Sequence, residues 1–116
     1  MRAGGSNTGI GERHMPELPE LNPVIHGKLR LALLSLLATV EEAEFTWLRT
    51  KTGSTDGNLG AQLIKLEEAG YVAVEKKFVQ RKPQTLYRMT EAGRTALGEY
   101  VAALKQLLGA AALGGE

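Results

Sequence analysis

The chain has 116 residues, which suits one domain with a single modest core, and chains of this size often gain stability by dimerising. It contains no cysteine, which excludes disulfides, thiolate metal sites and cysteine nucleophiles, and no apolar run is long enough to span a membrane. The formal net charge is only +1, so an affinity for nucleic acid would have to come from the local distribution of charge. We therefore expect a cytoplasmic protein without membrane contact.

The first 22 residues are expected to form a disordered or extended N-terminal arm. Residues 1–14 are polar and rich in glycine, and we interpret them as a disordered arm or as a leader foreign to the native chain, with Met15 as a candidate start. The next segment, MPELPELNP, contains three prolines and indicates an extended lead-in. We expect the domain itself over residues 23–108, followed by a flexible tail over residues 109–116.

An unusually apolar first helix is predicted from about Val24 to Val40. Its apolar stripe consists of Leu29, Ala32, Leu33, Leu36, Leu37 and Val40. Leu31 and Leu34 extend this stripe sideways, and a helix that is apolar over more than one face must be covered on more than one side. Part of this surface is therefore expected at a dimer interface, for which the candidates are Leu29, Leu33 and Leu37.

Two further helices are predicted, with a short glycine-containing turn between them. Thr46 is expected to cap a short helix that runs to about Thr52, and Gly53 suits the C-terminal end of that helix. Thr55 is expected to cap the next helix, which covers about residues 55–69. The buried edge of this third helix is predicted to consist of Leu59, Leu63 and Leu66.

The opposite edge of the third helix carries side chains suited to contacts with DNA. Asn58, Ala61 and Lys65 lie on it, with Gln62 at its shoulder. Asparagine and glutamine can pair with adenine through two hydrogen bonds, and lysine can contact guanine or phosphate. The same residues would also fit an ordinary solvated helix face, so their place in the fold has to decide between the two readings.

A β-hairpin with a basic loop is predicted after the third helix. The segments YVAVEKKF and TLYRM are β-rich, and VQRKPQ separates them. The stretch 76–88 contains no acid and five basic residues, Lys76, Lys77, Arg81, Lys82 and Arg88. We select Lys77, Arg81 and Lys82 as candidate phosphate contacts. The alternative is that these charges protect a sheet edge from aggregation. Phe78 and Tyr87 are interpreted as core or wing packing.

The last helix is predicted from about Glu91 to Leu108, with Thr90 as its cap. Its apolar residues recur at intervals of three and four, which resembles a coiled-coil seam over about two heptads. The first helix already covers the core, so both helices carry surplus apolar surface and a homodimer is expected. The alternative is that the seam only covers the protomer core. The candidate interface residues on this helix are Leu97, Tyr100, Val101, Leu104 and Leu108.

The order of these elements predicts the fold class. A short helix, a turn, a second helix and a hairpin make a winged helix-turn-helix, which is mainly α with a small β-hairpin wing. Here it carries an additional C-terminal dimerisation helix. In such a fold the second helix enters the major groove of DNA, and the hairpin can lie over the neighbouring backbone.

Several segments carry a closer resemblance. The pieces TDGNL, LIKLEEAGYV and RKPQTLYRMTEAGR, together with the apolar first helix, resemble the stand-alone winged-helix transcriptional regulators of the MarR and ArsR groups over about residues 24–105. The resemblance implies a homodimer in which the first and last helices pair. It also implies that Thr55, Asn58, Gln62 and Lys65 face DNA. This chain departs from the pattern at Gly60, Gln62 and Gln80, where relatives often carry serine, histidine and glycine.

We therefore expect a homodimeric, sequence-specific regulator of transcription whose partner is double-stranded DNA. The helix over residues 55–69 would read the major groove, and the basic wing over residues 76–88 would contact the backbone. No Ser-His-Asp set, phosphate loop or cluster of metal ligands is visible, so neither an enzyme nor a cofactor nor a metal is expected. The rival interpretation is a winged-helix module that binds proteins without specific DNA binding. A small-molecule effector between the first and last helices stays open.

Overall fold

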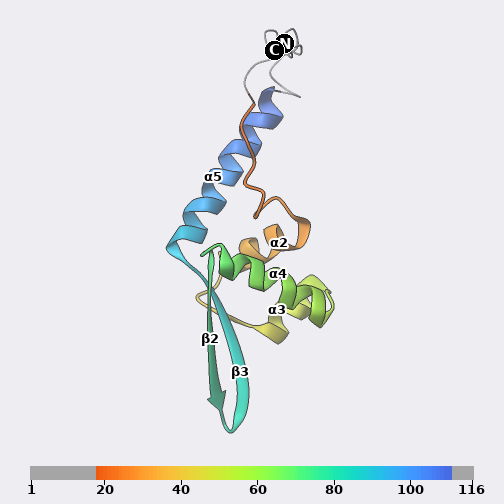
Figure 1. Ribbon diagram of the computed structural model, residues 1–116, viewed down its shortest axis with the longest axis vertical. Helices are drawn as coiled ribbons and strands as arrows, with labels where there is room; N and C mark the ends of the chain where they lie inside the picture. Colours follow the sequence, from red (N-terminus) through yellow and green to blue (C-terminus); the bar gives the residue numbers. More distant parts are fainter. Residues whose placement is uncertain (1–17, 111–116) are drawn as a thin grey trace, which may run out of the picture. The chain divides into compact units, whose positions relative to one another are not determined.

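The computed structural model describes residues 18–110. Most of the expected N-terminal arm and nearly all of the expected tail lie outside these residues. The elements are α2 (Lys28–Leu37), β1 (Ala43–Glu44), α3 (Phe45–Thr52), α4 (Asp56–Glu68), β2 (Val72–Val79), β3 (Lys82–Met89) and α5 (Glu91–Leu108), and Figure 1 shows their arrangement. Residues Leu21–Tyr100 form one compact unit, and the second half of α5 belongs to another. Among the described residues, no helix combines the length and apolarity needed to cross a membrane.

The predicted winged helix-turn-helix is confirmed. Helices α2, α3 and α4 pack together, and the β2–β3 hairpin extends away from them (Figure 1). Leucines on the inner faces of the three helices fill the core: Leu33, Leu34, Leu37, Leu48, Leu59, Leu63 and Leu66. Each fully buried leucine contributes roughly 1.5–3 kcal/mol relative to an exposed one, so this cluster is the main support for the position of α4.

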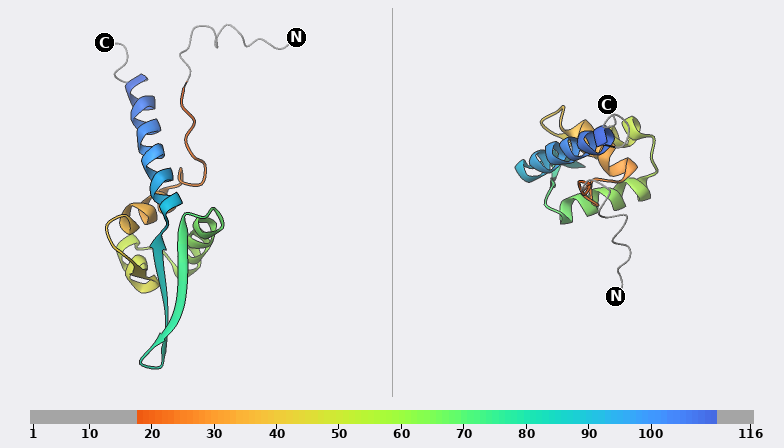
Figure 2. Two further views of the ribbon diagram at one scale, coloured as in Figure 1. Left: turned by 90° about the vertical axis from the view of Figure 1, so that its left-hand side faces the viewer. Right: turned by 90° about the horizontal axis from the view of Figure 1, so that it is seen from above.

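The wing is part of a three-stranded antiparallel sheet with the order β1-β3-β2. The two long strands run side by side along the whole hairpin (Figure 2, left). Val79 pairs with Lys82, so the turn consists of Gln80 and Arg81, which have φ values of 53° and 66°. Two consecutive positive φ values are the pattern of a type I′ turn, whose twist matches that of the flanking strands. The wing therefore turns tightly although its tip lacks the glycine that relatives often carry.

Helix ends follow local side-chain hydrogen bonds. Helix α2 begins later than predicted because Asn22 Oδ1 accepts hydrogen bonds from the Val24 and Ile25 amides, at 2.9 and 3.3 Å, and holds a turn there. The prediction that Thr46 caps α3 is wrong, since the N-cap is Glu44. Gly53 ends α3 in the left-handed conformation, as predicted.

Both threonine caps predicted further along the chain are confirmed. Thr55 Oγ1 accepts a hydrogen bond from the Asn58 amide at 3.2 Å and caps α4. Thr90 Oγ1 accepts one from the Gly93 amide at 3.0 Å and donates one to the Gly70 carbonyl at 2.6 Å. Thr90 therefore caps α5 and also ties it to the loop that follows α4.

Three of the residues expected at the dimer interface are buried within the single protomer. Leu33 and Leu37 are 0% exposed and Tyr100 is 4% exposed. The Tyr100 hydroxyl also lies 2.9 Å from His26 Nδ1. These three side chains serve the protomer's own core, because an apolar stripe at helical spacing looks the same whether its own chain or a partner covers it. The remaining candidates are all at least partly exposed: Leu29, Leu97, Val101, Leu104 and Leu108.

Candidate nucleic-acid interface

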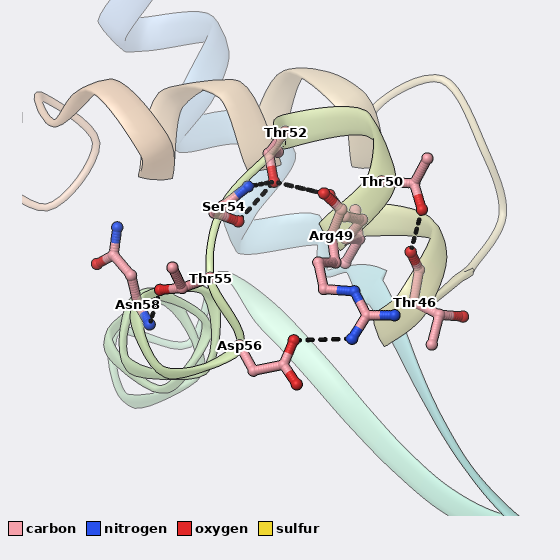
Figure 3. A network of polar contacts seen from close by, with 9 residues as sticks. Thr46, Arg49, Thr50, Thr52, Ser54, Thr55, Asp56 and Asn58 are labelled. Atoms are coloured by element: carbon pink, nitrogen blue, oxygen red, sulfur yellow. Dashed lines mark hydrogen bonds and ion pairs between the residues drawn. The ribbon is translucent and has the colours of Figure 1, made fainter.

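The turn between α3 and α4 is held by a local network of polar side chains (Figure 3). Thr52 Oγ1 and Ser54 Oγ lie 2.7 Å apart, and the Ser54 amide donates to Thr52 Oγ1 at 3.4 Å. Arg49 Nη1 on α3 pairs with Asp56 Oδ1 in the first turn of α4 at 2.8 Å. Both partners of this pair are partly in solvent, so it adds little to stability. It does link the two helices across the turn and places the acidic group at the positive end of α4.

The predicted reading edge of α4 is available to a partner. Thr55, Asn58, Ala61 and Lys65 are exposed, and Gln62 is half-buried beside them. This is the placement expected from the periodicity, because the leucines of the opposite edge are buried. Ile64 is also exposed on α4, a position that sequence reasoning missed because an isoleucine in a helix is normally assigned to the core.

Gln62 is held by contacts on both sides. Arg30 Nη1 on α2 donates to Gln62 Oε1 at 2.5 Å. Gln62 Nε2 in turn donates to Asn58 Oδ1, one helical turn earlier, at 3.2 Å. Two of the predicted site residues therefore form one hydrogen-bonded chain with an arginine that the sequence did not mark as part of the site.

The predicted basic residues of the wing are exposed along the hairpin. Lys77, Arg81 and Lys82 all face solvent, and the two arms are in register, with Lys77 opposite Gln84. Phe78, opposite Pro83, is 76% exposed, so its interpretation as core or wing packing is wrong. By this register, Phe78 points to the opposite face of the hairpin from Lys77 and Lys82, so the wing offers an apolar side chain on one face and cations on the other.

Tyr87 lies at the base of the hairpin, where it pairs with Ala43 and Val74, and not near the tip. It is buried, and its ring lies 6.3 Å from that of Phe45, between ring centroids. Burial raises the pKa of the Tyr87 hydroxyl above its usual value of 10.0, and the negative charge of Glu67 raises it further. The side chain is therefore uncharged at neutral pH and packs the base of the wing against α3.

An open groove of about 770 Å³ adjoins α4. Leu29, Ala32 and Leu36 of α2 line one side of it, and Asn58 and Gln62 of α4 line another. Its position differs from the space between the first and last helices that the sequence left open for an effector. Over residues 18–110, no group of three or more His, Asp or Glu side chains could hold a metal ion.

Comparison with known proteins identifies the family to which this chain belongs. Residues 29–108 match the family model described as a winged helix DNA-binding domain. An uncharacterized protein of Methanocaldococcus jannaschii is 36% identical over 84 residues, which cover 72% of this chain and 91% of that protein.

Two solved structures extend the comparison. A transcriptional regulator homologue from Pyrococcus horikoshii OT3 superposes with a TM-score of 0.69 at 25% identity, over 73% of this chain and 84% of that one. A structure described as a MarR-family transcriptional regulator from Enterococcus faecalis V583 gives a TM-score of 0.59 at 25% identity, over 90% and 88% of the two chains.

Proposed function

The chain belongs to the family of winged-helix DNA-binding domains, and on that premise we propose that it regulates transcription by binding specific double-stranded DNA sequences as a homodimer. The family match and the solved MarR-family structure confirm the resemblance that the sequence motifs indicated. The observation that carries the proposal is that the exposed edge of α4 and the basic hairpin belong to one compact unit, Leu21–Tyr100.

Helix α4 supplies the reading element of the proposed complex. The major groove is about 12 Å wide and admits one helix, whose N-terminal half meets the base edges. Thr55 and Asn58 lie in that half, and both are exposed. The acids Glu67 and Glu68 lie at the other end of α4, so they stay away from the phosphates when the N-terminal half is inserted. Asn58, Ala61 and Gln62 are therefore proposed to meet bases, and Lys65 to meet a base or a phosphate.

The wing supplies contacts that do not depend on sequence. Lys77, Arg81 and Lys82 would meet phosphate oxygens and release the counterions condensed on them. Phe78 would meet the apolar sugar edges of the adjoining groove, since the described protein leaves 76% of it exposed. The low net charge of the whole chain is compatible with this arrangement, because the field at the contact surface depends on the local cations.

A homodimer would double this interface. Helix α5 exposes Val101 and Leu108, at 41% and 53%, and Leu104 is half-buried. These residues recur at intervals of three and four, so they share one face of the helix, and an apolar face of this kind favours pairing with a second copy. A two-fold dimer would bind a roughly palindromic site whose half-sites are about one helical turn apart.

Selection of bound sequences from a pool of random DNA tests this proposal. We expect a palindromic consensus, and we expect its affinity to fall steeply with salt, with a slope set by the number of phosphates contacted. Binding that is no stronger for the selected sequences than for random DNA would refute the proposal. If, in addition, a protein partner co-purified with the chain, the rival role as a protein-binding module would take its place.

A further inference from the structure

We propose that Arg30 is a positioning residue that sets which hydrogen-bonding groups the reading helix offers to DNA. It acts through the chain Arg30–Gln62–Asn58 and makes Asn58 present its amide nitrogen, and so favours a base edge that only accepts hydrogen bonds. The inference rests on the proposed function, because it concerns how the same helix chooses between bases. It assigns a role in specificity to a residue of α2 that lies 32 positions before its partner in the sequence.

The donor-to-acceptor direction of the Arg30–Gln62–Asn58 hydrogen bonds is set by Arg30. A guanidinium group has only donors, so the Gln62 atom that faces Arg30 Nη1 must be the oxygen, as the 2.5 Å contact has it. The Gln62 nitrogen is then directed toward Asn58 and has to meet an acceptor, which is Asn58 Oδ1 at 3.2 Å. These hydrogen bonds use Asn58 Oδ1 and leave Asn58 Nδ2, with its two hydrogens, without a partner among them. One arginine thus fixes the orientation of two amides that would otherwise be free to flip.

Arg30 itself is held firmly by the segment that precedes α2. Its Nε donates a hydrogen bond to the Val24 carbonyl, and its Nη2 donates to the Pro23 carbonyl at 3.3 Å. That segment is in turn fixed by Asn22, whose side chain accepts from two backbone amides and donates to the Tyr71 hydroxyl at 2.8 Å. Two of the three contacts of the guanidinium group therefore do not depend on Gln62.

Gly27 provides the space for this guanidinium. A Cβ at position 27 would lie 2.7 Å from Arg30 Nη2 and 2.8 Å from Arg30 Cζ. The backbone of Gly27 has a φ of −150°, which any residue adopts. An alanine at position 27 would therefore be accepted by the backbone and would displace the flexible end of Arg30. Two independent sites on the chain, 27 and 30, thus control the same contact.

The arrangement predicts a base preference. In the major groove adenine offers a donor beside an acceptor, whereas guanine offers two acceptors and thymine offers one beside its methyl group. A bidentate contact with adenine needs both the oxygen and the nitrogen of one amide. The oxygens of Gln62 and Asn58 each already accept a hydrogen bond within the protein, which leaves the two hydrogens of Asn58 Nδ2 as the groups directed to a base. Adenine and thymine can accept only one of these hydrogens in the major groove, whereas guanine can accept both at N7 and O6. We therefore expect guanine at the base that Asn58 contacts.

Four variants of the full chain test this inference against the selected DNA site. Asn58→Ala identifies the base pair that Asn58 contacts, because the preference for one base should be lost at that position of the site alone. Wild-type protein should then discriminate guanine from adenine at that position by roughly tenfold, the range of one good base contact. Arg30→Met removes the donor and Gly27→Ala displaces it, so both should reduce this discrimination to less than about threefold. Lys28→Met is the matched control, since it removes an exposed neighbouring charge and leaves the hydrogen bonds of Gln62 to Arg30 and Asn58 in place.

The outcomes separate the two proposals. If wild-type protein prefers no sequence, the proposed function fails. If it prefers a sequence, but Arg30→Met and Gly27→Ala weaken all sequences equally and leave the preference intact, Arg30 is only structural and this inference fails. If Lys28→Met also lost the base preference, the effect would be due to charge, and the inference about Arg30 would be overturned. Thermal unfolding of each variant checks folding, and Gly27→Ala keeps every side chain of the leucine core if Arg30→Met is unstable.

Discussion

Gly93, in the first turn of α5, lies directly against the backbone of Tyr71, where a Cβ at position 93 would come within 2.2 Å of the Tyr71 carbonyl oxygen. The same oxygen accepts a hydrogen bond from the Thr90 amide at 3.0 Å. The loop between α4 and β2 therefore packs against the start of α5. This contact is possible because glycine at position 93 has no side chain.

Replacing Gly93 by alanine should destabilise the protein, because the obstacle is backbone and cannot move as a side chain can. We expect a loss in the free energy of unfolding on the order of 1–3 kcal/mol, the range for overpacking a filled site. Urea denaturation measures it. Gly98→Ala is the control within the same helix, since nothing lies within 4 Å of a Cβ there. That change should stabilise the protein by up to about 1 kcal/mol. Equal effects of the two variants would contradict the close contact at Gly93.

Replacing Lys82 by alanine should weaken binding to all DNA sequences by a similar factor. A phosphate contact carries no base information, so the slope of log affinity against log salt should decrease in magnitude by about one. Binding titrations at several salt concentrations, on the selected site and on random DNA, measure both quantities. Lys105→Ala removes the same charge from a residue of α5 that is not among the proposed contacts, and it should leave the slope unchanged. A selective loss on the specific site would show that Lys82 reads a base.

Replacing Phe78 by alanine should lower DNA affinity without changing the salt slope, because the ring contributes apolar contact and no charge. The protein itself should keep its stability, since the side chain is 76% exposed and supports no core. Affinity at two salt concentrations, together with the thermal midpoint, separates the two effects. Unchanged affinity at both salts would remove Phe78 from the proposed interface.

Tyr87 should make the stability of the fold sensitive to alkaline pH. Burial and the charge of Glu67 raise the pKa of its hydroxyl in the folded state above the value of 10.0 expected when the chain is unfolded. Above pH 10 the unfolded state loses this proton first and is favoured by doing so. The stabilisation is therefore complete below pH 10 and declines as pH rises through the folded pKa. Urea denaturation between pH 8 and about 11 should show a smaller decline in Tyr87→Phe than in the wild type.

Much of the fold could be predicted because it is specified by neighbouring residues. The leucine spacing of α4 determines which edge is buried, and Thr55, Gly53 and Thr90 act on backbone groups within a few residues. Strand β1 was not predicted, since its two residues pair with β3 more than 40 positions away and carry no local pattern. The late start of α2 was missed for a related reason, because Asn22 and not apolar spacing decides it.

The candidate site was predicted less completely. The exposed edge of α4 follows from helical periodicity, so Thr55, Asn58, Ala61 and Lys65 could be selected by spacing alone. Periodicity does not say what a half-buried side chain contacts. Gln62 was expected to face DNA freely, and the structure instead ties it to Arg30. Phe78 was assigned to packing because aromatic residues are usually covered, and a hairpin that extends away from the helices offers no cover near its tip.

The sequence by itself determined the helix-turn-helix-hairpin order, the caps at Gly53, Thr55 and Thr90 and the polar edge of α4, because each of these depends on spacing or on hydrogen bonds between near neighbours. Only the tertiary structure decided that Leu33, Leu37 and Tyr100 belong to the protomer core. It alone brought Arg30 to Gln62. The physical reason is common to both: burial and long-range hydrogen bonds depend on which faces meet when the chain is compact, and residues far apart in sequence meet only then.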